Sequence, residues 1–131
     1  MNDGRQHLVD FYLQRAEETL EDARSLAQNE RWYSAMNRLY YACFYAVQAA
    51  LHLKINLRVK THSGIKTLFN LHIVKEGLVD ERLSSFYSLL MQRRGESDYG
   101  DLEKPTDSEV KHFMSRAEEF IGTIKKIIRQ Q

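Results

Sequence analysis

Hydrophobic residues recur every three or four positions along most of the chain, which is the period of an amphipathic α-helix. No stretch shows the strict alternation of a half-buried β-strand. The pattern predicts helices over about 7–28, 31–53 and 64–75, another that begins at Asp80, and a last one that follows a capping box at 106–109. The expected architecture is all-α, an up-and-down bundle of about five helices in one domain, residues 1–131.

The stretch 31–53 is apolar around nearly its whole circumference, which is typical of a helix buried on most sides. We expect it to be the central helix, and its apolar run is too short to cross a bilayer. One face nevertheless carries polar and aromatic residues, and buried polar groups need hydrogen-bond partners. This face should therefore meet a partner helix, a ligand or a second subunit. Its residues are Asn37, Tyr41, Tyr45, Gln48 and His52.

Charge is distributed unevenly, although the formal net charge is only +1. No acidic residue lies between Glu30 and Glu76. Such a separation could steer an anion such as phosphate, or it could match the acidic flanks of the same fold or of a second copy. The basic residues of this segment are Arg31, Arg38, Lys54, Arg58, Lys60, Lys66 and Lys75.

Composition narrows the classes of function. The lone cysteine, Cys43, lies among apolar residues and is expected to pack in a core, as in a protein of a reducing compartment. The N-terminus lacks the apolar segment of a signal peptide, so a cytoplasmic location and no membrane association are expected. A single Glu109-x-x-His112 resembles half of a di-iron motif and is interpreted as a solvated helix face. We expect neither a metal site nor a cofactor.

The hydrophobic pattern of the helix that is expected to begin at Asp80 leads into a segment with several charged residues, 92–101. Extending it from Leu90 reaches Arg93 or Arg94, and a charged group on an inward face needs a partner of opposite charge. Asp98, four residues after Arg94, could pair with it on the helix. Alternatively, Arg94 could be displayed in a cleft to bind phosphate. Spacing alone favours the ion pair.

Three segments together resemble the HEPN domain, a small helical domain, and specifically its stand-alone prokaryotic branch. They are Trp32-Tyr-Ser-Ala with Asn37-Arg-Leu-Tyr-Tyr-Ala42 and Phe44, then Lys60-Thr-His-Ser-Gly64 with Phe69, then Arg94-Gly-Glu-Ser-Asp-Tyr99. The resemblance covers nearly the whole chain. It implies a homodimer, often accompanied by a minimal nucleotidyltransferase partner protein in toxin–antitoxin pairs. Many members are metal-independent ribonucleases, with an arginine followed after four to six residues by a histidine at the dimer interface.

The chain departs from that ribonuclease motif. Arg94 matches the arginine, but Tyr99 stands where the histidine is expected. A tyrosine with an ordinary pKa of about 10 is a poor base at neutral pH, although it can donate a hydrogen bond or stack on a base. The departure argues against enzymatic activity and leaves RNA or nucleotide binding open. His62, which lies near lysines at an expected helix start, is a candidate substitute, whereas His72 is expected to be packed.

The resulting hypothesis is a homodimer that binds a nucleotide or RNA phosphate in a basic cleft. Arg94, or Arg93 in its place, would bind phosphate, and Asp98 would orient the arginine. Lys60 and His62 would form the opposite wall. The first alternative is a metal-independent endoribonuclease that uses Arg94 with Tyr99 or His62, and the second is a non-catalytic protein-interaction module. The residues expected at the site are Asn37, Tyr41, Lys60, His62, Arg93, Arg94, Asp98 and Tyr99.

Overall fold

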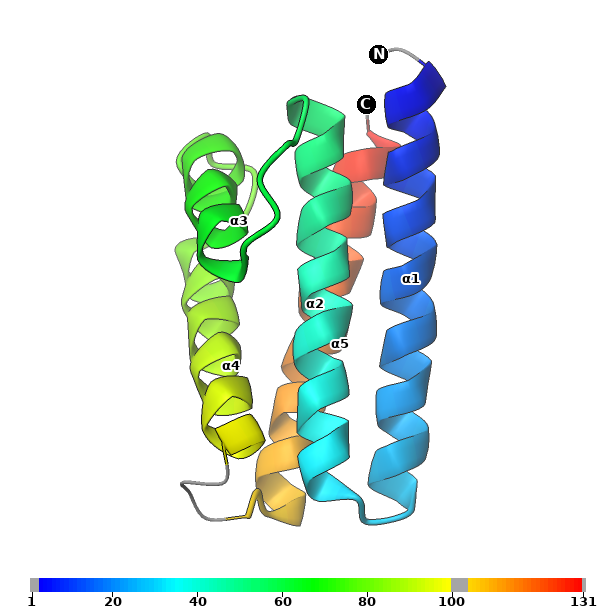
Figure 1. The fold of residues 1–131 in the computed structure, drawn as a ribbon, viewed down its shortest axis with the longest axis vertical. Helices are drawn as coiled ribbons and strands as arrows, with labels where there is room; N and C mark the ends of the chain where they lie inside the picture. Colours follow the sequence, from blue (N-terminus) through cyan, green and yellow to red (C-terminus); the bar gives the residue numbers. More distant parts are fainter. Residues whose placement is uncertain (1–2, 100–103, 131) are drawn as a thin grey trace.

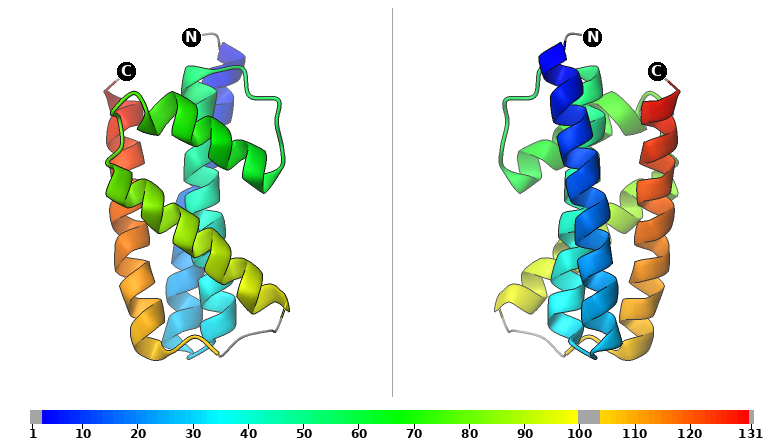
Figure 2. Two further views of the ribbon diagram at one scale, coloured as in Figure 1. Left: turned by 90° about the vertical axis from the view of Figure 1, so that its left-hand side faces the viewer. Right: turned by 90° about the vertical axis from the view of Figure 1, so that its right-hand side faces the viewer.

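The helix α2 (Trp32–Lys54) lies at the centre of the molecule in a computed structural model. The structure describes residues 3–99 and 104–130, and the side chains of residues 4–94 and 104–130. Helices α1, α2 and α5 run side by side along the long axis, while α3 and α4 cross α2 obliquely on the side away from α1 (Figures 1 and 2). The predicted all-α bundle is confirmed. The other elements are α1 (Asp3–Gln28), α3 (His62–Phe69), the π-helical turn η1 (Asn70–Val74), α4 (Glu81–Tyr99) and α5 (Asp107–Arg129).

Small residues explain how closely α2 packs with its neighbours. Ala42, Ala46 and Ala49 of α2 are fully buried, as are Ala16 and Ala23 of α1. A side chain that ends at Cβ lets the backbones of two helices approach, so these positions form a close seam. The expectation that α2 is the central core helix is confirmed.

The polar face of α2 divides between two environments. Near the C-terminal end of α2, Tyr12 of α1 stacks on His52 with ring centres 5.3 Å apart, and Arg5 donates hydrogen bonds of 3.1 Å to the carbonyl oxygens of His52 and Leu53. Those carbonyls end a helix and have no partner within it, so Arg5 acts as a cap. This half of the face therefore meets a partner helix of the same chain. The other half, near Tyr41, faces α3 and α4.

The third helix differs from its predicted span. It begins at His62 because the Thr61 side chain accepts a hydrogen bond of 3.1 Å from the Gly64 amide, which is the geometry of an N-cap. The α-helical turns end at Phe69, and the next turn widens into η1, where the Lys75 amide donates to the Asn70 carbonyl at 2.9 Å. The Asn70 side chain accepts a hydrogen bond of 2.9 Å from Ser84, which ties this turn to α4.

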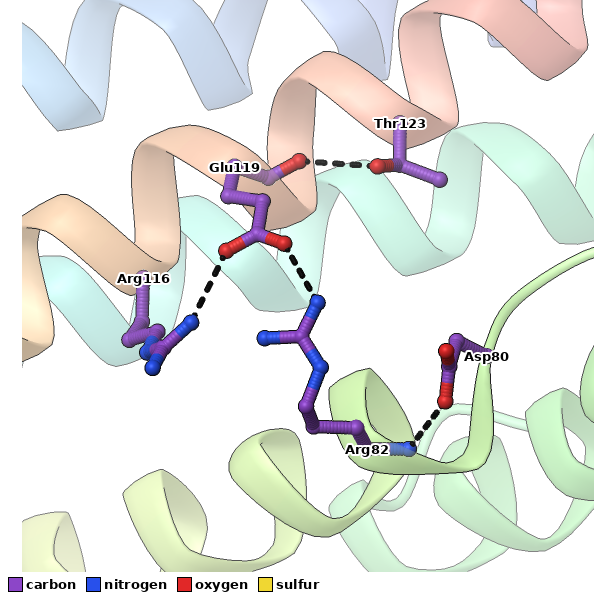
Figure 3. A network of polar contacts seen from close by, with 5 residues as sticks. All are labelled: Asp80, Arg82, Arg116, Glu119 and Thr123. Carbon is purple, nitrogen blue, oxygen red and sulfur yellow. Dashed lines mark hydrogen bonds and ion pairs between the residues drawn. The ribbon is translucent and has the colours of Figure 1, made fainter.

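Charged side chains fasten the start of α4 to α5. Arg82 and Arg116 both contact the Glu119 carboxylate, at 2.7 Å and 3.2 Å (Figure 3). The Asp80 side chain accepts a hydrogen bond of 2.8 Å from the Arg82 amide and so caps α4, which begins one residue after the predicted start at Asp80. These contacts are exposed, and each stabilises the fold modestly. Together they hold the start of α4 against α5.

Candidate functional site

Arg94 reaches from α4 across to the aromatic face of α2. Its guanidinium carbon lies 5.1 Å from the centre of the Tyr40 ring and 5.7 Å from that of Tyr41. A guanidinium over the face of an aromatic ring is attracted by the ring's electron density, and more strongly where water is partly excluded. The half-buried Arg94 side chain is therefore held in a defined position on the two tyrosines.

His62 lies on the same pair of tyrosines. The Tyr40 hydroxyl is 2.6 Å from His62 Nδ1, and the imidazole stacks on Phe44 with ring centres 4.4 Å apart. The edge-on contact with Tyr41, at 5.8 Å, completes its surroundings on α2. His62 is the first residue of α3, so the Thr61 cap that starts this helix also positions the imidazole. We name Arg94, His62, Tyr40, Tyr41 and Phe44 the Arg94 cluster.

Electrostatics keep His62 and Tyr40 uncharged at neutral pH. Burial lowers the pKa of His62 because it disfavours the charged imidazolium. The positive charge of Arg94 lowers this pKa further by repulsion. Burial raises the pKa of Tyr40 to about 12, although its contacts with Tyr87 and Arg94 act in the opposite direction. The cluster thus combines one permanent cation with a neutral imidazole and a neutral phenol.

A second arginine lies on the outer side of Tyr41. The guanidinium carbon of Arg38 is 5.0 Å from the centre of the Tyr41 ring, and Arg38 Nη2 donates a hydrogen bond of 2.7 Å to the Asn37 side chain. Tyr41 therefore contacts two guanidinium groups from different helices. Of the two residues expected at the site on this part of α2, Tyr41 contacts both Arg94 and His62, while Asn37 contacts Arg38.

The other predicted residues are placed differently. Arg93 points to α5 and forms an ion pair with Glu109, with Nη2 and Oε1 2.8 Å apart. Of the expected solvated face Glu109-x-x-His112, His112 is exposed, whereas Glu109 is half-buried because the end of α4 supplies a cation at this point. Lys60 is exposed in the connector that leads to His62. The side chains of Asp98 and Tyr99 lie outside the described residues.

Sequence reasoning missed several members of this site. Tyr40 and Phe44 were part of the segment that resembles HEPN domains, but they were not named as site residues. Their spacing of four residues places them on one face of α2, and that face meets His62 and, through Tyr40, Tyr87. No sequence signal showed that the connector after α2 returns the start of α3 to this face.

The described residues contain no grouping of three or more histidine, cysteine or acidic side chains that could hold a metal ion. Likewise, none of the described helices is both long enough and apolar enough to cross a membrane.

Known proteins resemble this chain along most of its length. The family model described as HEPN domain matches residues 9–127. A UPF0332 protein of Thermotoga maritima is 40% identical over 124 residues, which cover 95% of this chain and 93% of that protein. A Methanocaldococcus jannaschii protein named "Putative toxin MJ0605" is 35% identical over 115 residues, which cover 88% of this chain and 84% of the relative.

Proposed function

We propose that this chain, which belongs to the HEPN domain family, is a homodimeric component of a toxin–antitoxin pair that binds a phosphate of RNA or of a nucleotide. The observation that carries the proposal is the convergence of Arg94 and His62, from two different helices, on Tyr40. The toxin name of the archaeal relative supports the biological role.

The chemistry of the Arg94 cluster suits a phosphate diester. A guanidinium presents several N–H donors in a planar fork that matches phosphate oxygens, and the neighbouring imidazole can add one more donor. Tyr41, with a guanidinium on it from Arg38, offers an aromatic surface of the kind on which bases stack. Lys60, exposed just before His62, adds positive charge that attracts the backbone of a nucleic acid.

The test is binding and cleavage of a labelled single-stranded RNA in EDTA, at low and moderate salt, by wild type and by Arg94→Ala. We expect salt-dependent binding without cleavage, and a loss of at least tenfold in affinity for Arg94→Ala. Lys104→Ala is a matched control, because Lys104 is an exposed cation after α4 and outside the Arg94 cluster. Equal RNA affinity of wild type and Arg94→Ala would contradict the proposal.

A second candidate function is metal-independent RNA cleavage. The observation in its favour is that a neutral histidine, His62, lies beside Arg94, so a cation and an imidazole occur together as that chemistry requires. In this case RNA would be cut in EDTA, and both Arg94→Ala and His62→Ala would abolish the cutting. Tyr99, the other candidate for proton transfer, would be tested by Tyr99→Phe.

The homodimer is part of the proposal, and exposed apolar side chains of α1 support it. Leu8 is 36% exposed and Phe11 is 49% exposed, and Phe11 contacts the Tyr12 ring that packs on α2. Substituting Phe11→Glu should shift the mass in solution from dimer to monomer. Leu71→Glu is the control, because Leu71 is as exposed but lies on η1. A dimer unaffected by Phe11→Glu would assign the contact to another face.

A partner protein completes the proposal. We infer that a minimal nucleotidyltransferase would serve as the antitoxin, because the family resemblance implies such pairs. Co-expression of this chain with such an enzyme, followed by co-purification, tests the pairing. If the chain binds neither RNA nor nucleotide but retains the partner, it is a non-catalytic protein-interaction module.

A further inference from the structure

The hydrogen bond between Tyr40 and His62 can be arranged in two ways. At 2.6 Å, one of the two groups must donate: either the Tyr40 O–H donates to a bare Nδ1, or an Nδ1–H donates to the Tyr40 oxygen. The two arrangements correspond to the two neutral tautomers of histidine. They leave opposite chemistry at Nε2, which is a donor in the first tautomer and an acceptor in the second.

The burial of Tyr40 decides between them. Tyr40 is fully buried, and among the described residues its hydroxyl forms one hydrogen bond, the one with His62 Nδ1. The ring of Tyr87 stacks on that of Tyr40 with centres 5.9 Å apart, but the Tyr87 hydroxyl has no hydrogen-bond partner in the described part of the chain and so does not take the Tyr40 proton.

Only one direction gives the buried Tyr40 proton an acceptor. If His62 Nδ1–H donated to the Tyr40 oxygen, the Tyr40 O–H would be buried without an acceptor, which is unfavourable. If Tyr40 donates to a bare Nδ1, both groups are satisfied. The burial of Tyr40 therefore sets the direction of this bond.

We propose that Tyr40 is a positioning residue that holds His62 as the neutral tautomer with its proton on Nε2, so that His62 offers an N–H donor to a phosphate oxygen. This inference rests on the proposed function, since it states how the Arg94 cluster recognises its ligand. With Nδ1 occupied by Tyr40 and Nε2 already protonated, His62 cannot take the proton of a ribose hydroxyl. The site thus favours binding over cleavage.

The surroundings of His62 keep this state across neutral pH. From α2 it is faced by Tyr40, Tyr41 and Phe44, and from α4 by Arg94, while Lys60 lies two residues earlier in the connector. None of these side chains carries a negative charge that would favour an imidazolium. A second proton on Nδ1 would also force the Tyr40 O–H to turn away and leave a buried donor without an acceptor.

The first experiment measures the tautomer directly in the free protein. In protein labelled with ¹⁵N in the histidine rings, long-range ¹H–¹⁵N correlations at pH 7.5 should show His62 with a bare Nδ1 and a protonated Nε2. Tyr40→Phe removes the donor and the penalty for protonating Nδ1, so the pKa of His62 should rise by about one unit. A protonated Nδ1 in the wild type, or an unchanged His62 pKa in Tyr40→Phe, would overturn the inference.

Tyr87→Phe is the matched control. It removes one buried phenol hydroxyl, as Tyr40→Phe does, but it leaves the Tyr40 O–H pointing to His62. The tautomer of His62 should therefore persist, and its pKa should stay close to that of the wild type. A His62 pKa that rises equally in both variants would show that loss of packing, and not the Tyr40 bond, controls the imidazole, and would also overturn the inference.

A separate experiment links the tautomer to the ligand. With a single-stranded oligouridylate as the probe, His62→Gln, which keeps an N–H donor, should bind within about threefold of wild type, whereas His62→Phe should lose about tenfold. If wild type does not bind this probe or a nucleotide, the proposed function fails while the tautomer result stands. If RNA binds but Nδ1 carries the proton, only the inference fails.

Discussion

Arg93 donates two hydrogen bonds to the Glu109 carboxylate, one of 2.9 Å from Nε to Oε2 and one of 2.8 Å from Nη2 to Oε1. The next residue, Arg94, points instead to the tyrosines of α2. Two adjacent arginines on α4 thus have different tasks, because consecutive helix positions are about 100° apart around the axis. Arg93 joins α4 to α5, and Arg94 belongs to the candidate site.

This division predicts that the two alanine variants change different properties: Arg93→Ala changes stability, and Arg94→Ala changes RNA affinity. Arg93→Ala should lower the free energy of unfolding by about 1 kcal/mol, a modest loss because both partners are partly exposed, and should leave RNA affinity nearly unchanged. Arg94→Ala should reduce RNA affinity. Urea unfolding and RNA titration of both variants check this prediction, and a loss of RNA affinity in Arg93→Ala equal to that in Arg94→Ala would contradict it.

The Arg93–Glu109 pair also predicts a dependence of stability on pH. The hydrogen bonds from Arg93 lower the pKa of Glu109 below its ordinary value of 4.5. A carboxyl group with a depressed pKa in the folded state stabilises the fold fully above its unfolded pKa, and this contribution is lost as the pH falls through the folded value. Wild type should therefore exceed Glu109→Gln in stability at pH 7, and the difference should shrink as the pH falls below 4.5 and through the lowered pKa of the folded state.

Urea unfolding of wild type and Glu109→Gln between pH 7 and pH 3 measures this difference. Glu119→Gln serves as a comparison: Arg82 and Arg116 also lower the pKa of Glu119, but on an exposed surface where solvent screens the charges, so its pH-dependent difference should be smaller. If the difference in the free energy of unfolding between wild type and Glu109→Gln stays constant from pH 7 to pH 3, titration of Glu109 does not cause the pH dependence of stability.

The buried thiol of Cys43 reports whether the core around α2 becomes exposed to solvent. The thiol is fully buried in the centre of α2, and burial raises its pKa far above the ordinary range. Because the thiolate is the reactive form, a thiol reagent should not label the native protein at pH 8 and should label it fully in denaturant. Labelling of the native protein at the rate of a free thiol would show that α2 opens locally.

Much of the fold follows from periodicity, but the site does not. The apolar circumference of 31–53 predicted a central helix, and the capping box at Thr106 predicted the start of α5, where the Thr106 side chain accepts a hydrogen bond of 3.1 Å from the Glu109 amide. Both are local signals, since they depend on residues at most one or two turns apart. Such signals survive in the tertiary structure because packing agrees with them here.

The site depends on contacts that no local signal encodes. His62 meets Tyr40 across 22 positions of sequence, and Arg93 meets Glu109 across 16. The sequence showed that Arg93 or Arg94 would be inward, but the choice between them depends on the crossing angle of α4 over α2, which the hydrophobic pattern does not fix. Similarly, residues 70–74 were predicted as ordinary helix, but they form the π-helical turn η1, in which Asn70 contacts Ser84 of α4.

Two glycines give opposite predictions for the same substitution. A Cβ at Gly64 would lie 2.6 Å from the Thr61 hydroxyl oxygen that caps α3, and it would also collide with the Val59 side chain. Gly64→Ala should therefore disturb the cap and lower the free energy of unfolding by about 1 kcal/mol or more. Gly122 in α5 has no atom within 4 Å of an added Cβ, so Gly122→Ala should stabilise the protein by up to about 1 kcal/mol through helix propensity alone.

The two variants also differ in their effect on the site. The Thr61 cap begins the helix whose first residue is His62, so Gly64→Ala should shift the His62 ring signals and weaken RNA binding, whereas Gly122→Ala should change neither. Thermal unfolding, histidine ¹⁵N spectra and RNA titration of both variants check this expectation. If Gly64→Ala leaves the His62 signals where they are in wild type, then the Tyr40 bond and the Phe44 stack suffice to position the imidazole, and the cap stabilises α3 alone.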